Sequence, residues 1–213
     1  MSKVVFLSLS FALLVAALSS RSPAADTSTP SGESGDGAGF KPLVEAPMPE
    51  GFPAYTPVGQ IEVKKYPAYR KAETRGRTAF WTLFQHITTS GISMTAPVEM
   101  TFEADGPPVG REQAMAFLYG DQSLGSAGKK GDVEVTDVPP ATVVCLGMRG
   151  QRTEQAVVQA EHRLRDWLNQ NKDRYEQCGP VRIMGYNSPF VARDRQFYEV
   201  QIPIRESAAK ASA

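Results

Sequence analysis

Reactive and metal-binding side chains are scarce in this chain of 213 residues, which contains two cysteines and two histidines. The spacings that usually carry chemistry are missing: there is no CxxC, no HExxH, no glycine-rich phosphate loop and no Ser-His-Asp order. Two histidines without further ligands do not form a metal site. We therefore expect no catalytic residues and a protein that is not an enzyme.

An excess of one charge is also missing. Lysine and arginine together number 23, aspartate and glutamate together number 23, and the formal net charge is zero. Nucleic-acid binding requires a basic footprint, and a strongly charged partner requires a block of like charges. The chain has neither feature, so we expect no nucleic-acid partner. No pattern indicates the oligomeric state.

The cysteines are too few to form a disulfide framework. Cys145 lies in an apolar run typical of a strand, where a buried free thiol behaves as a small apolar side chain. In an oxidising compartment it would instead be able to pair with Cys178. Both alternatives are compatible with the sequence.

Long apolar runs are absent after residue 18. The run at residues 4–18 follows the basic Lys3 and leads into small residues up to Ala25, a pattern typical of a secretory signal peptide. Its length of about fifteen residues falls short of the roughly twenty that span a bilayer. We predict a signal peptide at residues 1–25, a periplasmic or secreted location, and no membrane contact after cleavage. The alternative is an anchor that is never cleaved.

The remainder of the chain divides by composition. Residues 26–39 include no large apolar side chain, and such a segment cannot bury enough surface to offset its ordering entropy. We predict a flexible low-complexity linker at residues 26–51, one domain at residues 52–205 and a disordered tail at residues 206–213.

Two parts of the domain repeat one order of elements. Each begins with an alternating strand that runs into a proline, at residues 61–67 and 133–139. A second strand, an amphipathic helix and two further strands follow in each part. The first part has strands at 68–74, 94–102 and 113–119 and a helix at 78–87; the second has strands at 141–148, 181–186 and 196–204 and a helix at 153–170. This order predicts an α+β domain of duplicated β-α-β-β halves, forming a distorted β-barrel or curved sheet flanked by two helices.

The block Met94-Thr95-Ala96-Pro97-Val98 closely follows the first helix, and its proline is tolerated only at a strand start, an edge or a bulge. Three further stretches accompany it, in the same order as in a known family: Ile61-Glu62-Val63-Lys64-Lys65-Tyr66-Pro67, Gly185-Tyr186-Asn187-Ser188-Pro189-Phe190 and Arg195-Gln196-Phe197-Tyr198-Glu199-Val200. Together they resemble the SOUL haem-binding protein family. The resemblance implies the duplicated fold and a haem or other tetrapyrrole ligand, with haem as the cofactor. Tyr198 departs from the family, in which Asn is common there.

The first helix is where we expect the ligand. His86 lies on the flank of its apolar stripe, beside small residues that would leave room for a flat molecule. The residues expected to contact the ligand are His86, Ala79, Thr82, Leu83, Trp81, Phe84 and Met94. Since family members bind tetrapyrroles with or without an axial histidine, His86 is either an iron ligand or a half-exposed helix residue. His162 lies off the apolar stripe of the second helix and is expected in solvent.

Glu199 interrupts an otherwise apolar terminal strand. Alternation places it on one face with Gln201, and Tyr198 on the other. Glu199 either faces solvent or, as in the effector-binding domains to which the family is similar, lies with Tyr186 in a cavity that attracts cations. A buried carboxyl has a raised pKa unless it is paired, and the candidate partners are Arg182 and Arg195.

We therefore predict an exported, non-enzymatic protein that carries or buffers haem or another tetrapyrrole. The alternative is a sensor of hydrophobic or cationic small molecules that uses Glu199. A hydrolase with Glu199 beside Tyr198 or Tyr186 is the least favoured hypothesis, because alternation separates Tyr198 from Glu199.

Overall fold

A computed structural model describes residues 40–102 and 112–207 of the chain. The predicted signal peptide at residues 1–25 lies outside the described residues. The elements in chain order are β1 (Ile61–Tyr66), β2 (Tyr69–Thr74), α1 (Ala79–Thr89), β3 (Val98–Phe102), β4 (Glu112–Leu118), β5 (Gly128–Lys130), β6 (Val133–Val138), β7 (Ala141–Arg149), α2 (Glu154–Gln170), β8 (Tyr175–Gln177), β9 (Arg182–Gly185), the 3₁₀ turn η1 (Arg193–Arg195) and β10 (Phe197–Glu206).

The predicted repeat of elements is confirmed. β1 and β6 both end one residue before a proline, at Pro67 and Pro139, because proline has no N–H to continue a ladder. Helix α2 begins where Thr153 caps it, since the Thr153 side chain accepts a hydrogen bond from the Ala156 amide at 3.2 Å. β5 and β8, each three residues long, are additions that the sequence patterns did not predict.

The strands form one antiparallel sheet in the order β1-β7-β10-β9-β3-β4-β2-β6-β5, with β8 paired to β10. The two ends of this order are β1 and β5, so the sheet is curved and open rather than a closed barrel. The halves meet where β3 pairs with β9. They also exchange strands: β1 pairs with β7 of the second half, and β6 pairs with β2 of the first.

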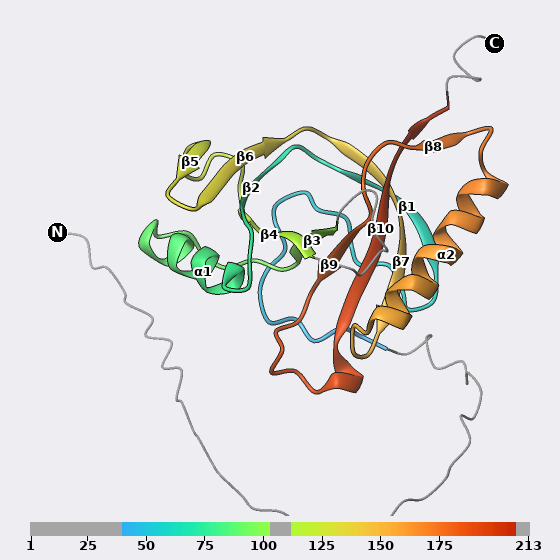
Figure 1. Cartoon of the computed structure of the whole chain (residues 1–213), viewed down its shortest axis with the longest axis horizontal. Helices are drawn as coiled ribbons and strands as arrows, with labels where there is room; N and C mark the ends of the chain where they lie inside the picture. The colour runs from blue at the N-terminus through green and yellow to red at the C-terminus, as the bar shows by residue number, and fades with distance from the viewer. Residues whose placement is uncertain (1–39, 103–111, 208–213) are drawn as a thin grey trace, which may run out of the picture. The chain divides into compact units, whose positions relative to one another are not determined.

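Both helices cover the same face of the sheet, near opposite ends (Figure 1). Alternation assigns the side chains: Met100 of β3, Ile183 of β9 and Val200 of β10 point to the helices. The core beneath α2 joins Leu164 to these strands, and a second core joins Leu83 of α1 to β4 and β6. The positions between them along the strands point to the opposite, helix-free face.

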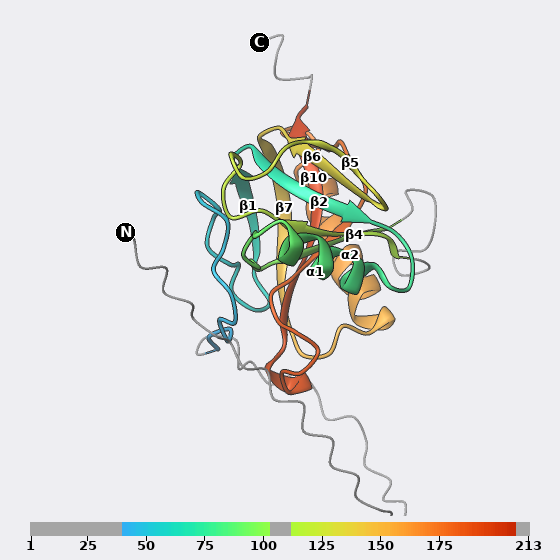
Figure 2. The ribbon, with the colours of Figure 1, turned by 90° about the vertical axis from the view of Figure 1, so that its left-hand side faces the viewer.

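The helix-free face is covered by residues 40–60, which we call the covering segment. Figure 2 shows it beside β1, on the side away from α2. Phe52 packs on Tyr66 and Cys145, while Phe40 and Tyr55 pack near Phe197. Residues 40–51 were predicted to end a flexible linker. They are instead bonded to the domain, since the Glu50 amide donates to the Gly120 carbonyl at 2.9 Å.

The block that carried the resemblance forms the entry to β3. Pro97 follows a cis Ala96–Pro97 peptide and lies one residue before the strand, a position where a missing N–H breaks no ladder. The Thr95 hydroxyl donates to the Leu118 carbonyl of β4 at 2.5 Å. The block is therefore structural: it fixes how the chain passes from α1 into the central strands.

The disulfide alternative is wrong in this structure. Cys145 is buried on the helix-free face and Cys178 is exposed, and both are free thiols. Within residues 40–102 and 112–207, no helix combines the length and apolar character that crossing a bilayer requires. Of the predicted tail, residues 206 and 207 are described and attached: the Ser207 amide donates to the Arg174 carbonyl at 3.0 Å.

Candidate functional site

The outer side of α1 carries a group of three aromatic rings, half-buried Phe80 and exposed Trp81 and Phe84, which we call the α1 aromatic surface. Phe80 and Phe84 are stacked, with ring centroids 6.2 Å apart, and Phe80 meets Trp81 edge-on at 5.4 Å. Trp81 is 66% exposed and Phe84 is 42% exposed. Grouped exposed apolar side chains mark binding surfaces more often than isolated ones do.

The helix itself does not require these aromatic rings. Leu83 and Ile87 already supply its buried stripe, and Phe80 is anchored edge-on against Phe117 of β4 at 5.3 Å. Trp81 and Phe84 therefore project from a fixed base into solvent. Rings held in this way can bury a flat apolar ligand without a large loss of side-chain entropy.

Positive charge lies at the start of the same helix. Arg75 and Arg77 are exposed just before α1, and neither takes part in the ion pairs found among the described residues. The first turn of α1 has no acidic residue, and Thr78 makes no side-chain cap bond. Two arginines that precede the aromatic helix by a few residues suit a ligand that carries carboxylates on an apolar body.

His86 lies on the other flank of α1. At about 100° per residue, it is roughly 140° around the helix from Trp81. Its Nε2 atom lies 2.8 Å from the hydroxyl of buried Tyr119, and the two rings stack at 6.5 Å. Burial, then Lys130, lowers the pKa of His86, so the imidazole is neutral at pH 7. An iron atom that bound to Nε2 would have to displace the hydrogen bond between Nε2 and the Tyr119 hydroxyl.

The other predicted contact residues divide between the core and the surface. Ala79 and Leu83 are buried beneath α1, and Met94 is half-buried against the same core. Thr82 is half-buried on the His86 flank. The structure thus brings Trp81 and Phe84 together but separates them from His86, and His162 is exposed as predicted.

The second candidate site is the interior of the helix-free face, around Glu199. This side chain is fully buried, so of the two alternatives the one in which it faces solvent is wrong. Glu199 Oε1 accepts hydrogen bonds from Lys64 Nζ and the Thr56 amide, both at 2.6 Å. Its Oε2 atom accepts from Gln201 Nε2 at 2.7 Å. The partner is therefore Lys64 of β1, neither Arg182 nor Arg195.

Arg182 instead serves a second buried carboxylate, Glu99 of β3. Arg182 Nη1 lies 2.9 Å from Glu99 Oε2, and Lys71 Nζ lies 2.7 Å from Oε1. Burial opposes ionisation of Glu99, but Arg182 and Lys71 outweigh it and hold its pKa below the ordinary value. Arg182 Nε also donates to Gln201 Oε1 at 3.0 Å, which joins the Glu99 and Glu199 groups into one network.

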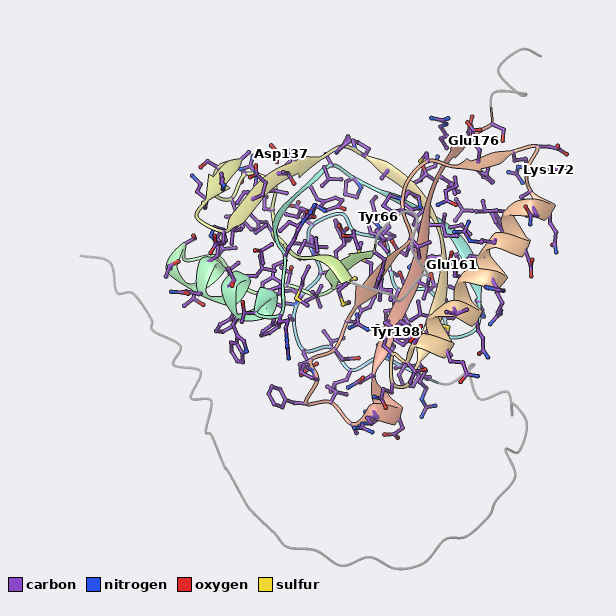
Figure 3. The ribbon with its side chains drawn as sticks, in the orientation of Figure 1. Tyr66, Asp137, Glu161, Lys172, Glu176 and Tyr198 are labelled. Atoms are coloured by element: carbon purple, nitrogen blue, oxygen red, sulfur yellow. The ribbon has the colours of Figure 1, made fainter. Side chains whose placement is uncertain are left out.

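Tyrosines line this network. Tyr66, which points into the interior in Figure 3, accepts a hydrogen bond at its hydroxyl from Gln201 at 2.9 Å. Burial, with Glu199 second, raises the pKa of Tyr186 well above its ordinary value. Burial likewise raises the pKa of Cys145 to about 12, so this thiol is protonated at pH 7.

Lys64 and Glu99 were not predicted from the sequence. Glu99 lies between two apolar residues in β3 and Lys64 follows Val63 in β1, a pattern that elsewhere means a solvent-facing side chain. The signal that would have found them is the number of charges predicted on one sheet face: three cations and two carboxylates can be buried only as a network.

The carboxylates are held by cations, and the buried thiol is protonated. Among the described residues, no three His, Cys, Asp or Glu side chains are placed to hold a metal ion.

Comparison with known proteins agrees with the fold. The family described as SOUL heme-binding protein matches residues 52–203. No protein of curated function matches the sequence. The C-terminal domain of EcmrR is similar in structure with a TM-score of 0.52 and 14% identity, covering 70% of this chain and 98% of that one. An uncharacterized conserved protein from Listeria innocua has a TM-score of 0.54 and 10% identity, covering 71% and 95%. A hydrolase from the same organism has a TM-score of 0.51 and 10% identity, covering 71% and 94%. At these identities the likenesses show the fold alone.

Replacing Glu199 tests the buried pair. We expect Glu199→Gln to lower the free energy of unfolding by about 3 kcal/mol, because Lys64 is left charged and buried without a counter-ion. Urea unfolding at pH 7 measures the change. The control is Glu176→Gln, which breaks the exposed Arg205–Glu176 pair and should cost less than about 1 kcal/mol. Equal effects of the two substitutions would contradict the assignment.

Glu99 should contribute to acid sensitivity. Its folded pKa is below the ordinary value, so the stabilisation it provides is fully present above the unfolded pKa of 4.5 and is lost as pH falls through the folded value. We expect Glu99→Gln to be less stable than the parent at pH 7, with a smaller further loss between pH 5 and pH 3. Urea unfolding across that range is the measurement. Glu134→Gln, on the exposed side of β6, should keep the parent profile.

Proposed function

Because the chain belongs to the SOUL heme-binding protein family, we propose that it binds haem or another tetrapyrrole and carries or buffers it without chemical conversion. The observation that carries the proposal is the α1 aromatic surface, where Trp81 and Phe84 are exposed and contact half-buried Phe80. A tetrapyrrole is a flat apolar ring with carboxylate side chains. The aromatic rings fit the macrocycle, and Arg75 and Arg77 fit its carboxylates.

This mode of binding does not need an axial ligand from His86. Burial of apolar area contributes roughly 25 cal/mol per Å² before the entropy cost of association, and aromatic faces add a stacking preference. His86 lies on the opposite flank of α1, and its Nε2 is engaged by Tyr119. When haem is bound, the iron would offer redox and ligand-binding chemistry; the residues described here supply a surface and charges.

The proposal includes an exported location and the absence of enzymatic activity. Export rests on the apolar run at residues 4–18 with its basic start and small-residue end. The absence of enzymatic activity is supported by the state of the interior, where each buried carboxylate is paired with a cation and the Cys145 thiol is protonated.

A second candidate function is sensing of hydrophobic or cationic small molecules at Glu199. It is supported by the burial of Glu199 next to Tyr66 and Tyr186, which would surround an organic cation with aromatic rings. Lys64 already neutralises this carboxylate at 2.6 Å, and the covering segment occupies the approach. A cation would have to replace both, so this function ranks second.

Haemin titration of the mature protein tests the first proposal. We expect a Soret shift on binding, and roughly 10- to 100-fold weaker affinity in the double variant Trp81→Ser, Phe84→Ser, since buried aromatic anchors dominate such surfaces. The matched control is Phe190→Ser, because Phe190 is 81% exposed but lies outside α1. Absence of binding by the parent protein, or equal affinity of the double variant and the control, would refute the proposed surface.

A separate titration tests the role of His86. We expect His86→Ala to leave the haemin affinity within a few-fold of the parent and the Soret maximum unchanged, because its Nε2 atom is bonded to Tyr119. Tyr119→Phe, which releases the imidazole, provides the comparison. A Soret maximum that moves in His86→Ala would show instead that the histidine ligates the iron.

A further inference from the structure

The covering segment is anchored to the most buried part of the sheet. Its Thr56 is completely buried, and the Thr56 amide donates to Glu199 Oε1 at 2.6 Å. The Thr56 hydroxyl also lies 3.0 Å from the sulfur of Cys145. Both partners are themselves fully buried, so this short stretch of chain occupies the position from which a ligand would reach the interior.

Aromatic packing and a close backbone approach support the same anchor. Phe52 meets Tyr66 and Tyr69 edge-on, at 4.9 and 5.3 Å. At Gly147 of β7, a Cβ atom would lie 2.3 Å from the Thr56 carbonyl oxygen and 2.5 Å from that of Pro57. The strand thus leaves room for the segment only because residue 147 has no side chain.

The remainder of the segment has no regular secondary structure and is attached at separate points, such as the bonds from the Glu50 amide to the Gly120 carbonyl at 2.9 Å and from the Ala96 amide to the Pro47 carbonyl at 3.0 Å. The whole segment contains five prolines. Among the described residues it forms one isolated β-bridge, between Val58 and Gly147 of β7. Val44 is 76% exposed, and Glu45 is attached through exposed hydrogen bonds to Ser188. Segments with few buried contacts and exposed hydrogen bonds open at lower free energy than the core strands do.

The interior beneath the segment is polar and incompletely satisfied. Arg182 Nη2 is buried and has no hydrogen-bond partner within the part of the chain that the structure describes. The cations Lys64, Lys71 and Arg182 are paired with Glu199, Glu99 and, through Lys71, Glu73. The face therefore retains an unused donor, which a small ligand with an acceptor group would complement.

We propose that the covering segment is a strap that closes the helix-free face: its release, without unfolding of the sheet, opens the interior around Glu199 and Arg182 to small polar ligands. The device does not depend on tetrapyrrole binding at α1, which lies on the other face. Access of ligands to the interior would then be controlled by release of residues 40–60 and not by opening of the sheet.

The thiol of Cys145 reports on this opening because Thr56 covers it. The experiment uses the full chain with Cys178→Ser, so that Cys145 is the one remaining cysteine. Labelling with Ellman's reagent at constant pH is followed at several urea concentrations below the unfolding transition. Phe52→Ala removes the aromatic anchor, and Gly147→Ala places a methyl group against the Thr56 carbonyl.

The controls change the other face of the sheet by similar amounts. Leu164→Ala creates a cavity under α2, and Gly185→Ala adds a methyl group that meets the flexible end of Met100 at 3.1 Å. Urea unfolding of every variant gives its global stability.

We expect Phe52→Ala and Gly147→Ala each to accelerate labelling roughly tenfold or more at low urea, with a weak dependence on urea, because a local opening exposes little surface. Leu164→Ala and Gly185→Ala should leave the low-urea labelling rate near that of the parent. Labelling that follows global stability in every variant, with the full urea dependence of unfolding, would overturn the proposal. So would unchanged labelling in Phe52→Ala, which keeps the test decisive if Gly147→Ala does not fold.

Discussion

The burial of Glu199 is the constraint on which most of the helix-free face depends. A carboxylate removed from water is tolerated only when charges and donors surround it. Here those groups come from distant parts of the chain: Lys64 from β1, the Thr56 amide from the covering segment and Gln201 from its own strand. The Lys64–Glu199 ion pair thus links β1 to β10 across β7. The hydrogen bond from the Thr56 amide to Glu199 fixes the path of the covering segment, which has no regular secondary structure of its own.

Each half of the fold contributes one of the two buried carboxylates, from strands that are not equivalent in the repeat. Glu99 lies in β3 and Glu199 in β10, one in each half, and Arg182 connects them through Glu99 on one side and Gln201 on the other. The pairing of β3 with β9 alone would hold the halves by backbone bonds. The exchange of β1 and β6 between halves and the buried network add specificity, because a shifted register would leave charges unpaired.

Most of the fold could be predicted from the sequence, because alternation, proline positions and the helical stripe at Leu83 and Ile87 are local patterns. The face assignment along β10 was also predictable. Which face is covered was not predictable: residues 40–51 show no helix or strand pattern, and their packing depends on a face that forms only when the sheet is complete. The partners of Glu199 escaped prediction for the same reason, since Lys64 is far away in sequence and looks like a solvent-facing strand residue.

The two proposed ligand sites lie on opposite sides of the sheet and differ in what a ligand would have to displace. Inside, every strong charge has a partner of opposite sign, so an entering molecule must replace bonds that already exist and must displace Thr56. On the outer side of α1, the exposed faces of Trp81 and Phe84 contact solvent, and a flat apolar molecule that bound there would displace water. A ligand the size of a tetrapyrrole would require a large rearrangement of the interior but none of α1. The free energy needed to rearrange the protein, more than the strength of the contacts with the ligand, would therefore favour the outer side of α1 for a macrocycle. The interior would then suit small polar molecules.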